Sequence, residues 1–212
     1  IIDIGCGPGH STKVLKSRWP DSEIIGLDNS ASMLEQAKKI EGNIQWLCKS
    51  ASEDLSGLGK FDIVFSNAAI QWITDQNSLL SKLFQLLTDT GTLAVQVPCT
   101  QYMPLHTALQ QLIKIPKWEG VFQSLSSTDS IHASGFYYDI LSGLSDNIDL
   151  WETNYFHTMK SHYDMIQWYS SSGLRPYLAC LTDEREKEAF LVEYEDLLKG
   201  AYPLQKNHKV LL

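Results

Sequence analysis

The sequence predicts an α/β fold with a doubly wound, mostly parallel sheet of the Rossmann-like type. Short apolar runs alternate with segments of helical period through the first half of the chain. A glycine-rich turn joins the first run to the first helix, and an acidic residue ends the second run. This spacing is typical of βαβ units, whose right-handed crossovers place helices on both faces of a sheet.

The first half contains the elements of this sheet. Five strands are expected, at residues 1–4, 23–27, 44–48, 61–65 and 93–97. One helix follows Gly9, and Ser30 and Asp75 are suited to cap the next two. The third helix is expected to run through Leu87 and to stop at Gly91.

The second half changes character after Val97. Helical spacing recurs at residues 104–113, 136–144, 161–172 and 182–199, and one further strand is expected at 148–157. We therefore expect residues 1–99 to form the core. Residues 150–157 should add a strand to it, and residues 100–149 and 158–208 should form a helical cap over the sheet edge, not an independent domain.

Composition excludes several classes of protein. The 212 residues carry a net charge of −8, which argues against binding to a nucleic-acid backbone. No apolar run approaches the roughly 18 residues of a membrane span. The four cysteines are far apart and lack the spacing of zinc ligands, so we expect no metal site and a reducing, cytoplasmic setting. We also expect a monomer.

The turn Asp3-Ile4-Gly5-Cys6-Gly7-Pro8-Gly9 indicates a nucleoside-binding loop. Glycines let a backbone approach a ligand closely, and Asp28 ends the second strand where a carboxylate can accept both ribose hydroxyls. His10 stands where the dinucleotide fingerprint requires Gly or Ala, and no Gly-Lys-Ser/Thr phosphate loop is present. The alternative is a purely structural turn followed by a helix-capping aspartate.

These residues resemble the first motif and the ribose acid of class I S-adenosylmethionine-dependent methyltransferases. The stretch 61–72, which ends in Asn67-Ala68-Ala69-Ile70-Gln71-Trp72, resembles their fourth-strand motif. Residues 149–153, 172–177 and 201–203 are similar to members that methylate a small polycarboxylic acid such as trans-aconitate. The family also has a helix before the first strand and a final strand, and both are expected to lie outside this sequence.

The resemblance implies S-adenosylmethionine as the cofactor. The glycines would lie under its methionine part and ribose, Met33 beside the adenine, and Asn67 and Ala68 near the methionyl ammonium. The residues that it implies for cofactor binding are Asp3, Gly5, Gly7, Gly9, Asp28, Asn29, Met33, Ser50, Ala51, Asn67 and Ala68.

The reaction implied is esterification of a carboxylate on a small-molecule acid. Such an acceptor has a pKa near ~4 and is already ionised at neutral pH, so we assign no catalytic side chain. The expected acceptor-binding residues are Trp72, His106, Tyr138 and Arg175, with Tyr137 as a further candidate. Arg175, expected outside any helix, has the bidentate geometry that suits a carboxylate.

Three alternatives remain open on the sequence. One is a carboxyl methyltransferase acting on a diacid bound to an acyl-carrier protein, as in biotin synthesis. Another is a non-catalytic protein that binds S-adenosylmethionine. The last is a nicotinamide-dependent oxidoreductase, which His10 disfavours.

Overall fold

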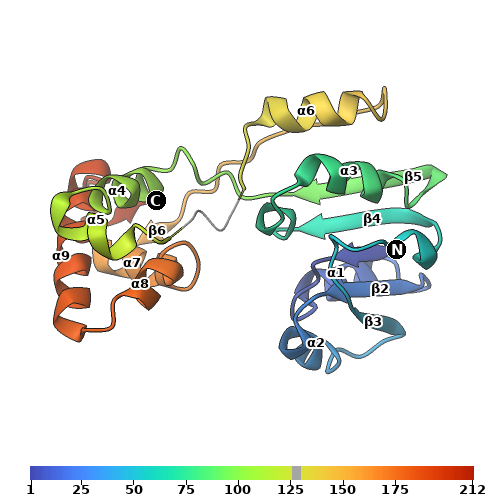
Figure 1. The fold of residues 1–212 in the computed structure, drawn as a ribbon, viewed down its shortest axis with the longest axis horizontal. Helices are drawn as coiled ribbons and strands as arrows, with labels where there is room; N and C mark the ends of the chain where they lie inside the picture. The colour runs from blue at the N-terminus through green and yellow to red at the C-terminus, as the bar shows by residue number, and fades with distance from the viewer. Residues whose placement is uncertain (126–129) are drawn as a thin grey trace. The chain divides into compact units, whose positions relative to one another are not determined.

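The sheet expected from the sequence is present in the computed structural model, which describes residues 1–125 and 130–212. Five strands pair in parallel in the order β3-β2-β1-β4-β5 (Figure 1). They are β1 Ile2–Ile4, β2 Ile24–Asp28, β3 Ile44–Cys48, β4 Phe61–Asn67 and β5 Leu87–Gln96. The strand order reverses between β1 and β4, and ligands in such sheets bind beyond the carboxyl ends of the strands at this point.

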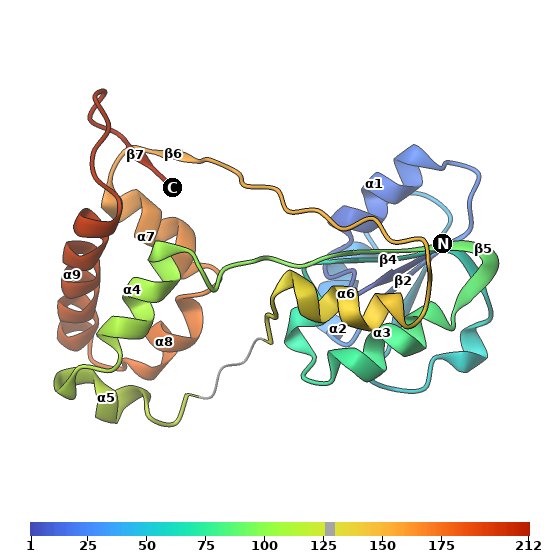
Figure 2. The same ribbon diagram turned by 90° about the horizontal axis from the view of Figure 1, so that it is seen from above.

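Helices cover both faces of this sheet. Figure 2 shows α1 on one side and α3 and α6 on the other. The helices here are α1 His10–Arg18, α2 Ala31–Ala37, α3 Gln76–Phe84 and α6 Ser134–Ser142, with 3-10 turns η1 Ser56–Leu58 and η2 Ile70–Trp72. The expected caps are confirmed, because Ser30 accepts from the Met33 amide and Asp75 from the Ser78 amide.

The end of the third helix differs from the expectation. Helix α3 stops at Phe84, and Leu87 already belongs to β5. Hydrogen bonding to β4 replaces helical hydrogen bonding here, because the Phe61 amide donates to the Leu86 carbonyl at 2.8 Å. Gly91 is therefore inside β5 and is not a helix stop. It lies where the register shifts, and a side chain there would meet the Phe61 carbonyl oxygen at 2.8 Å.

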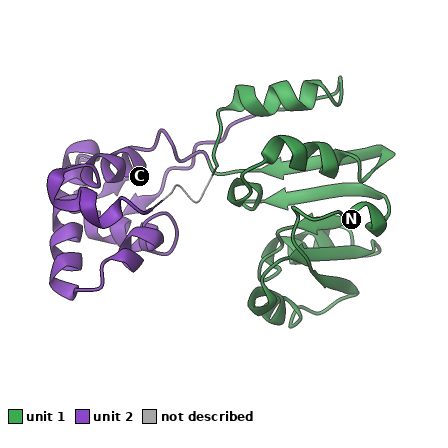
Figure 3. Ribbon diagram, viewed as in Figure 1, with its two compact units in different colours: residues 1–98, 129–150 green, residues 99–128, 151–212 purple. Residues whose placement is uncertain are grey.

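The described residues divide into two compact units (Figure 3). The first comprises residues 1–98 and 130–150, and the second comprises 99–125 and 151–212. The second unit contains α4 Pro104–Leu112, α5 Pro116–Phe122, α7 His162–Ser170, α8 Arg175–Cys180 and α9 Glu184–Ala201, with the antiparallel pair β6 Thr158–Met159 and β7 Val210–Leu211. It has its own hydrophobic core, in which Leu105, Leu109, Phe190 and Tyr194 are fully buried.

This division corrects the expected boundaries in two places. Helix α6 belongs with the sheet rather than with the cap, because its Tyr137 is buried in the same apolar cluster as the leucines of α3. Residues 150–157 form no strand in the described part of the chain; only the last of them, His157, exchanges backbone hydrogen bonds with Leu212, at 2.9 and 3.0 Å, next to the Thr158–Leu211 pair of β6 and β7. A strand needs a hydrogen-bonded neighbour as well as suitable residues. The part of the cap prediction on 126–129 lies outside the described residues.

Candidate functional site

The glycine loop leaves β1 at Gly5 and enters α1 at His10. The amides of Gly5 and Cys6 both donate to the Leu27 carbonyl, at 2.8 and 3.0 Å, which ties the loop to β2. Gly5 has φ +70°, and a Cβ at this position would lie 2.3 Å from the Ala69 Cβ. Only glycine combines this backbone conformation with this approach, so the loop and the segment after β4 are held in contact.

The other two loop glycines differ in their surroundings. A Cβ on Gly9 would lie 2.5 Å from Ile40 Cδ1 and 2.8 Å from the Trp46 ring, so this glycine lets α1 pack closely. A Cβ on Gly7 would meet no atom within 4 Å. The backbone of Gly7 is therefore open to a ligand.

Asp28 ends β2, as expected, and organises the loop. One carboxylate oxygen accepts from the Gly7 amide and the other from the Ser30 amide, each at 2.8 Å. A carboxylate offers about four lone-pair positions, so Asp28 keeps acceptor capacity for two ribose hydroxyls. Asn29 and Met33 follow on the exposed start of α2, and Met33 is 40% exposed.

Asp3 is fully buried beneath the loop. One of its oxygens accepts from the hydroxyls of Ser11, at 2.8 Å, and Thr12, at 2.6 Å. Its Oδ1 has no hydrogen-bond partner among the described residues. Burial raises the pKa of this carboxyl, although the two hydroxyl donors act in the opposite direction. An orphaned acceptor of this kind is suited to a donor supplied by a ligand or by water.

The ends of β3 and β4 complete this edge of the sheet. Asn67 and Ala68 are exposed after β4, and Ala68 takes a left-handed backbone conformation with φ +52°. After β3, Ala51 is buried, while the Ser50 hydroxyl accepts from the Ser52 amide within a turn. The structure thus brings all the predicted cofactor residues to the carboxyl ends of β1–β4, with the loop between them.

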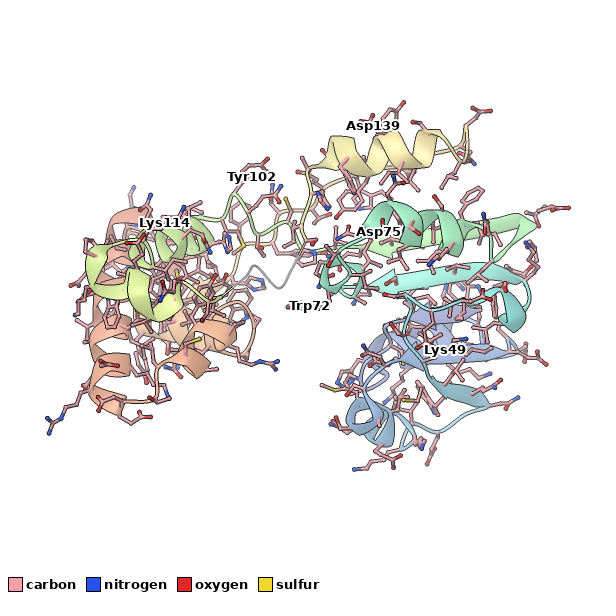
Figure 4. The ribbon with its side chains drawn as sticks, in the orientation of Figure 1. Lys49, Trp72, Asp75, Tyr102, Lys114 and Asp139 are labelled. Atoms are coloured by element: carbon pink, nitrogen blue, oxygen red, sulfur yellow. The ribbon has the colours of Figure 1, made fainter. Side chains whose placement is uncertain are left out.

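The predicted acceptor residues fall into both units. In the first, Trp72 is 58% exposed and Tyr138 52% exposed, and Figure 4 shows Trp72 beyond the carboxyl end of β4. Tyr137, beside Tyr138, is instead buried, and its hydroxyl donates to Gln76 Oε1 at 2.9 Å.

In the second unit, His106 Nδ1 lies 3.3 Å from the Tyr169 hydroxyl. Arg175 is exposed, and its guanidinium has no hydrogen bond or ion pair within the part of the chain that the structure describes. The expectation that Arg175 lies outside a helix is wrong, because it is the first residue of α8. Pro176 at the next position is a helix-start signal that explains this.

Two buried glutamines were not predicted from the sequence. Gln71 and Gln76 lie in and after η2 and are almost completely buried. The Gln-Trp pair of the motif was the available signal for Gln71, but the letters alone do not distinguish a buried amide from an exposed one. In the described ranges no three His, Cys, Asp or Glu side chains are grouped to hold a metal, and no helix is long and apolar enough to span a membrane.

The chain is similar to known methyltransferases in sequence and in fold. Residues 1–91 match a methyltransferase domain family. Trans-aconitate 2-methyltransferases from Escherichia coli and Escherichia fergusonii are each 37% identical to this chain, over 100% of it and 81% of their own length. The crystal structure of the plantazolicin methyltransferase BpumL, solved with a triazolic desmethylPZN analog and SAH, is similar in fold. Its TM-score is 0.53 at 14% identity, over 99% of this chain and 72% of that one.

Proposed function

This chain belongs to the S-adenosylmethionine-dependent methyltransferases, in the family of the trans-aconitate 2-methyltransferases, and from this premise we propose that it esterifies a carboxylate of a small polycarboxylic acid such as trans-aconitate. The activity for which the two Escherichia relatives are named supports this acceptor class. The composition of the site supports it too. Its described residues include no paired acid and base, and an ionised carboxylate needs no general base.

Three features of the glycine loop and its neighbours fit the cofactor. Gly7 has open space above it, Asp28 has free acceptor positions, and Asp3 has an orphaned oxygen. When bound, S-adenosylmethionine supplies an electrophilic methyl group on a positively charged sulfur. We assign the ribose hydroxyls to Asp28 and the methionine part to the backbone of Gly5–Gly9, Asn67 and Ala68.

The protein's contribution to the reaction is binding and alignment. Charge is neutralised as the anionic acceptor approaches the cation, so holding both reactants in line and excluding water accounts for catalysis. Trp72 and Tyr138 offer exposed aromatic surface for this purpose, and His106 and Arg175 offer polar groups. Arg175 is proposed to pair with a carboxylate of the acceptor.

Asp28 carries the cofactor assignment, and its substitution tests it. Asp28→Ala should bind S-adenosylhomocysteine at least about tenfold more weakly in calorimetric titration, since hydrogen bonds to a charged group contribute about 1.5–3 kcal/mol. Asp21→Ala, an exposed acid after α1, is the matched control and should bind like the wild type. Unchanged affinity in Asp28→Ala would contradict the assignment.

The acceptor is tested separately by turnover with labelled S-adenosylmethionine. A panel of free di- and tricarboxylates should be methylated, with trans-aconitate among the best acceptors. Methylation confined to a carrier-bound diacid would replace the proposed acceptor class, and cofactor binding without turnover on any acid would indicate a binding protein.

A further inference from the structure

The segment after β4 contains a side-chain clamp on a strained residue. Gln71 is only 3% exposed, and its Nε2 donates to the Ala68 carbonyl at 2.7 Å. Ala68 has φ +52°, a conformation that alanine rarely adopts. Its amide donates to the Gln96 carbonyl at 2.9 Å. Ala68 is therefore held on one side by β5 and on the other by Gln71.

Within the described part of the chain, the clamp leaves a buried polar atom without a hydrogen bond, which lowers the stability of the fold. Gln71 Oε1 is buried and has no hydrogen-bond partner among the described residues. Turning the amide over would place this oxygen against the Ala68 carbonyl, so the side chain is confined to one orientation. A buried acceptor without a partner destabilises a fold, and native proteins tolerate such groups mainly at functional sites.

Ala68 stands where its backbone orientation affects the cofactor site. Its neighbour Ala69 lies against Gly5, so the segment after β4 and the glycine loop form adjacent walls of the proposed cofactor site. A change of backbone conformation at Ala68 would turn the exposed groups of Asn67 and Ala68 and displace Ala69 from Gly5. We propose that Gln71 is a positioning residue that holds this wall in its cofactor-binding conformation; the inference rests on the cofactor site of the proposed function.

A second glutamine provides a matched control. Gln76 is equally buried, but its amide bridges the Ser130 carbonyl and the Tyr137 hydroxyl, the latter at 2.9 Å. In the described residues its side chain makes no hydrogen bond with residues 67–69, although the Ser130 amide donates to the Gln71 carbonyl at 2.7 Å. Gln76 thus secures the approach to α6, whereas the Gln71 amide acts on Ala68.

Methionine substitutions separate the two roles, because methionine is unbranched, of similar length and lacks the amide. Gln71→Met should bind S-adenosylhomocysteine about tenfold more weakly by calorimetry, the order expected for losing one buried hydrogen bond and the conformation it holds. Gln76→Met should bind within about twofold of the wild type, yet lower the thermal unfolding midpoint at least as much. Wild-type affinity in Gln71→Met, or an equal loss in Gln76→Met, would overturn the proposal.

Gln71→Glu adds a pH-dependent readout. A protonated carboxyl can donate to the Ala68 carbonyl, whereas a carboxylate cannot, and burial favours the protonated form. The affinity of Gln71→Glu relative to the wild type should therefore be highest at about pH 5 and fall as the pH rises. A ratio that does not change with pH would count against the clamp.

Asp28→Ala belongs in the same titration series. If it loses affinity while Gln71→Met does not, the cofactor site stands and the role of Gln71 is wrong. If the wild type itself does not bind S-adenosylhomocysteine, both the proposed function and this inference fail.

Discussion

Gly5 and Gly7 share a left-handed backbone but not an environment. Both have positive φ, which costs any other residue about 1–2 kcal/mol. Only Gly5 also faces an atom at 2.3 Å, the Cβ of Ala69, whereas the space around Gly7 is open. Substitutions at Gly5 therefore test packing, and substitutions at Gly7 test ligand binding.

Gly5→Ala should lower the free energy of unfolding by about 1–3 kcal/mol more than Gly7→Ala, because it overpacks the contact with Ala69. Gly7→Ala should weaken S-adenosylhomocysteine binding, while its loss of stability should be limited to the cost of the left-handed backbone, about 1–2 kcal/mol. Urea unfolding and calorimetry measure the two effects. Equal destabilisation by both substitutions would show that the Ala69 contact relaxes freely.

Asp3 makes stability depend on pH. Because burial raises its pKa above the ordinary value of 3.8, the folded state holds more protons than the unfolded state between the two pKa values. Stability from this group is therefore fully present below about pH 4 and decreases as the pH rises through the raised pKa.

Asp3→Asn has the same shape and no charge, so it should lack this slope. Its free energy of unfolding relative to the wild type should increase from about pH 4 to pH 7 in urea titrations. A difference that shrinks over this interval would mean that Ser11 and Thr12 stabilise the carboxylate enough to lower its pKa.

Among the elements, α9 shows how a cap defines a helix of the second unit. The Asp183 carboxylate accepts from the amides of Arg185, at 2.8 Å, and Glu186, at 3.1 Å. Farther along the helix, Asp196 makes only an exposed ion pair with Lys199. Asp183 accepts hydrogen bonds from helix amides that otherwise lack a partner, which stabilises the helix. The ion pair of Asp196 contributes little to stability because solvent screens it.

Asp183→Ala should destabilise the protein by about 1 kcal/mol, the usual cost of losing an N-cap. Asp196→Ala, the control on the same helix, should have a clearly smaller effect. Chemical unfolding followed by circular dichroism gives both values. If the two substitutions cost the same, the cap does not contribute beyond an ordinary surface charge.

At the scale of the whole molecule, the predicted site residues are divided between the two units. The first unit contains every predicted cofactor residue, whereas His106 and Arg175 belong to the second. A protein with a net charge of −8 repels an anionic acceptor, so a local cation is needed to offset the field. Arg175 is exposed and meets this requirement.

Arg175→Lys should raise the KM for a polycarboxylate several-fold and leave cofactor affinity unchanged, because lysine cannot bind a carboxylate in a bidentate manner. Arg185→Lys, at an exposed position near the start of α9, is the control and should leave the kinetics unchanged. Steady-state kinetics at saturating cofactor measure both. Wild-type kinetics in Arg175→Lys would assign acceptor binding to other residues.

Local sequence patterns alone determined most of the helices and strands, and the cofactor residues at the carboxyl ends of the strands. Strand β3 has the expected bounds, and Ser30 and Asp75 cap the helices they were expected to cap. These features depend on residues within one or two turns of each other, so the sequence contains the information. The glycine loop and Asp28 were predictable for the same reason, because a βαβ unit brings them together.

Only the tertiary structure decided the features that depend on distant partners. Leu86 and Leu87 continue the helical pattern of α3, yet the Leu86 carbonyl accepts from Phe61 of β4 and Leu87 begins β5. Residues 150–157 have the composition of a strand, but within the described part of the chain only His157 among them has a backbone partner, Leu212, so Trp151 and Phe156 remain exposed. Tyr137 is buried beside an exposed Tyr138 because α6 packs on α3. The hydrogen bond from Gln71 to Ala68 is local, but the surroundings that it acts on exist only once Ala68 meets Gln96 and Ala69 meets Gly5. Hydrogen bonds and close contacts between distant residues leave no periodic trace in the sequence.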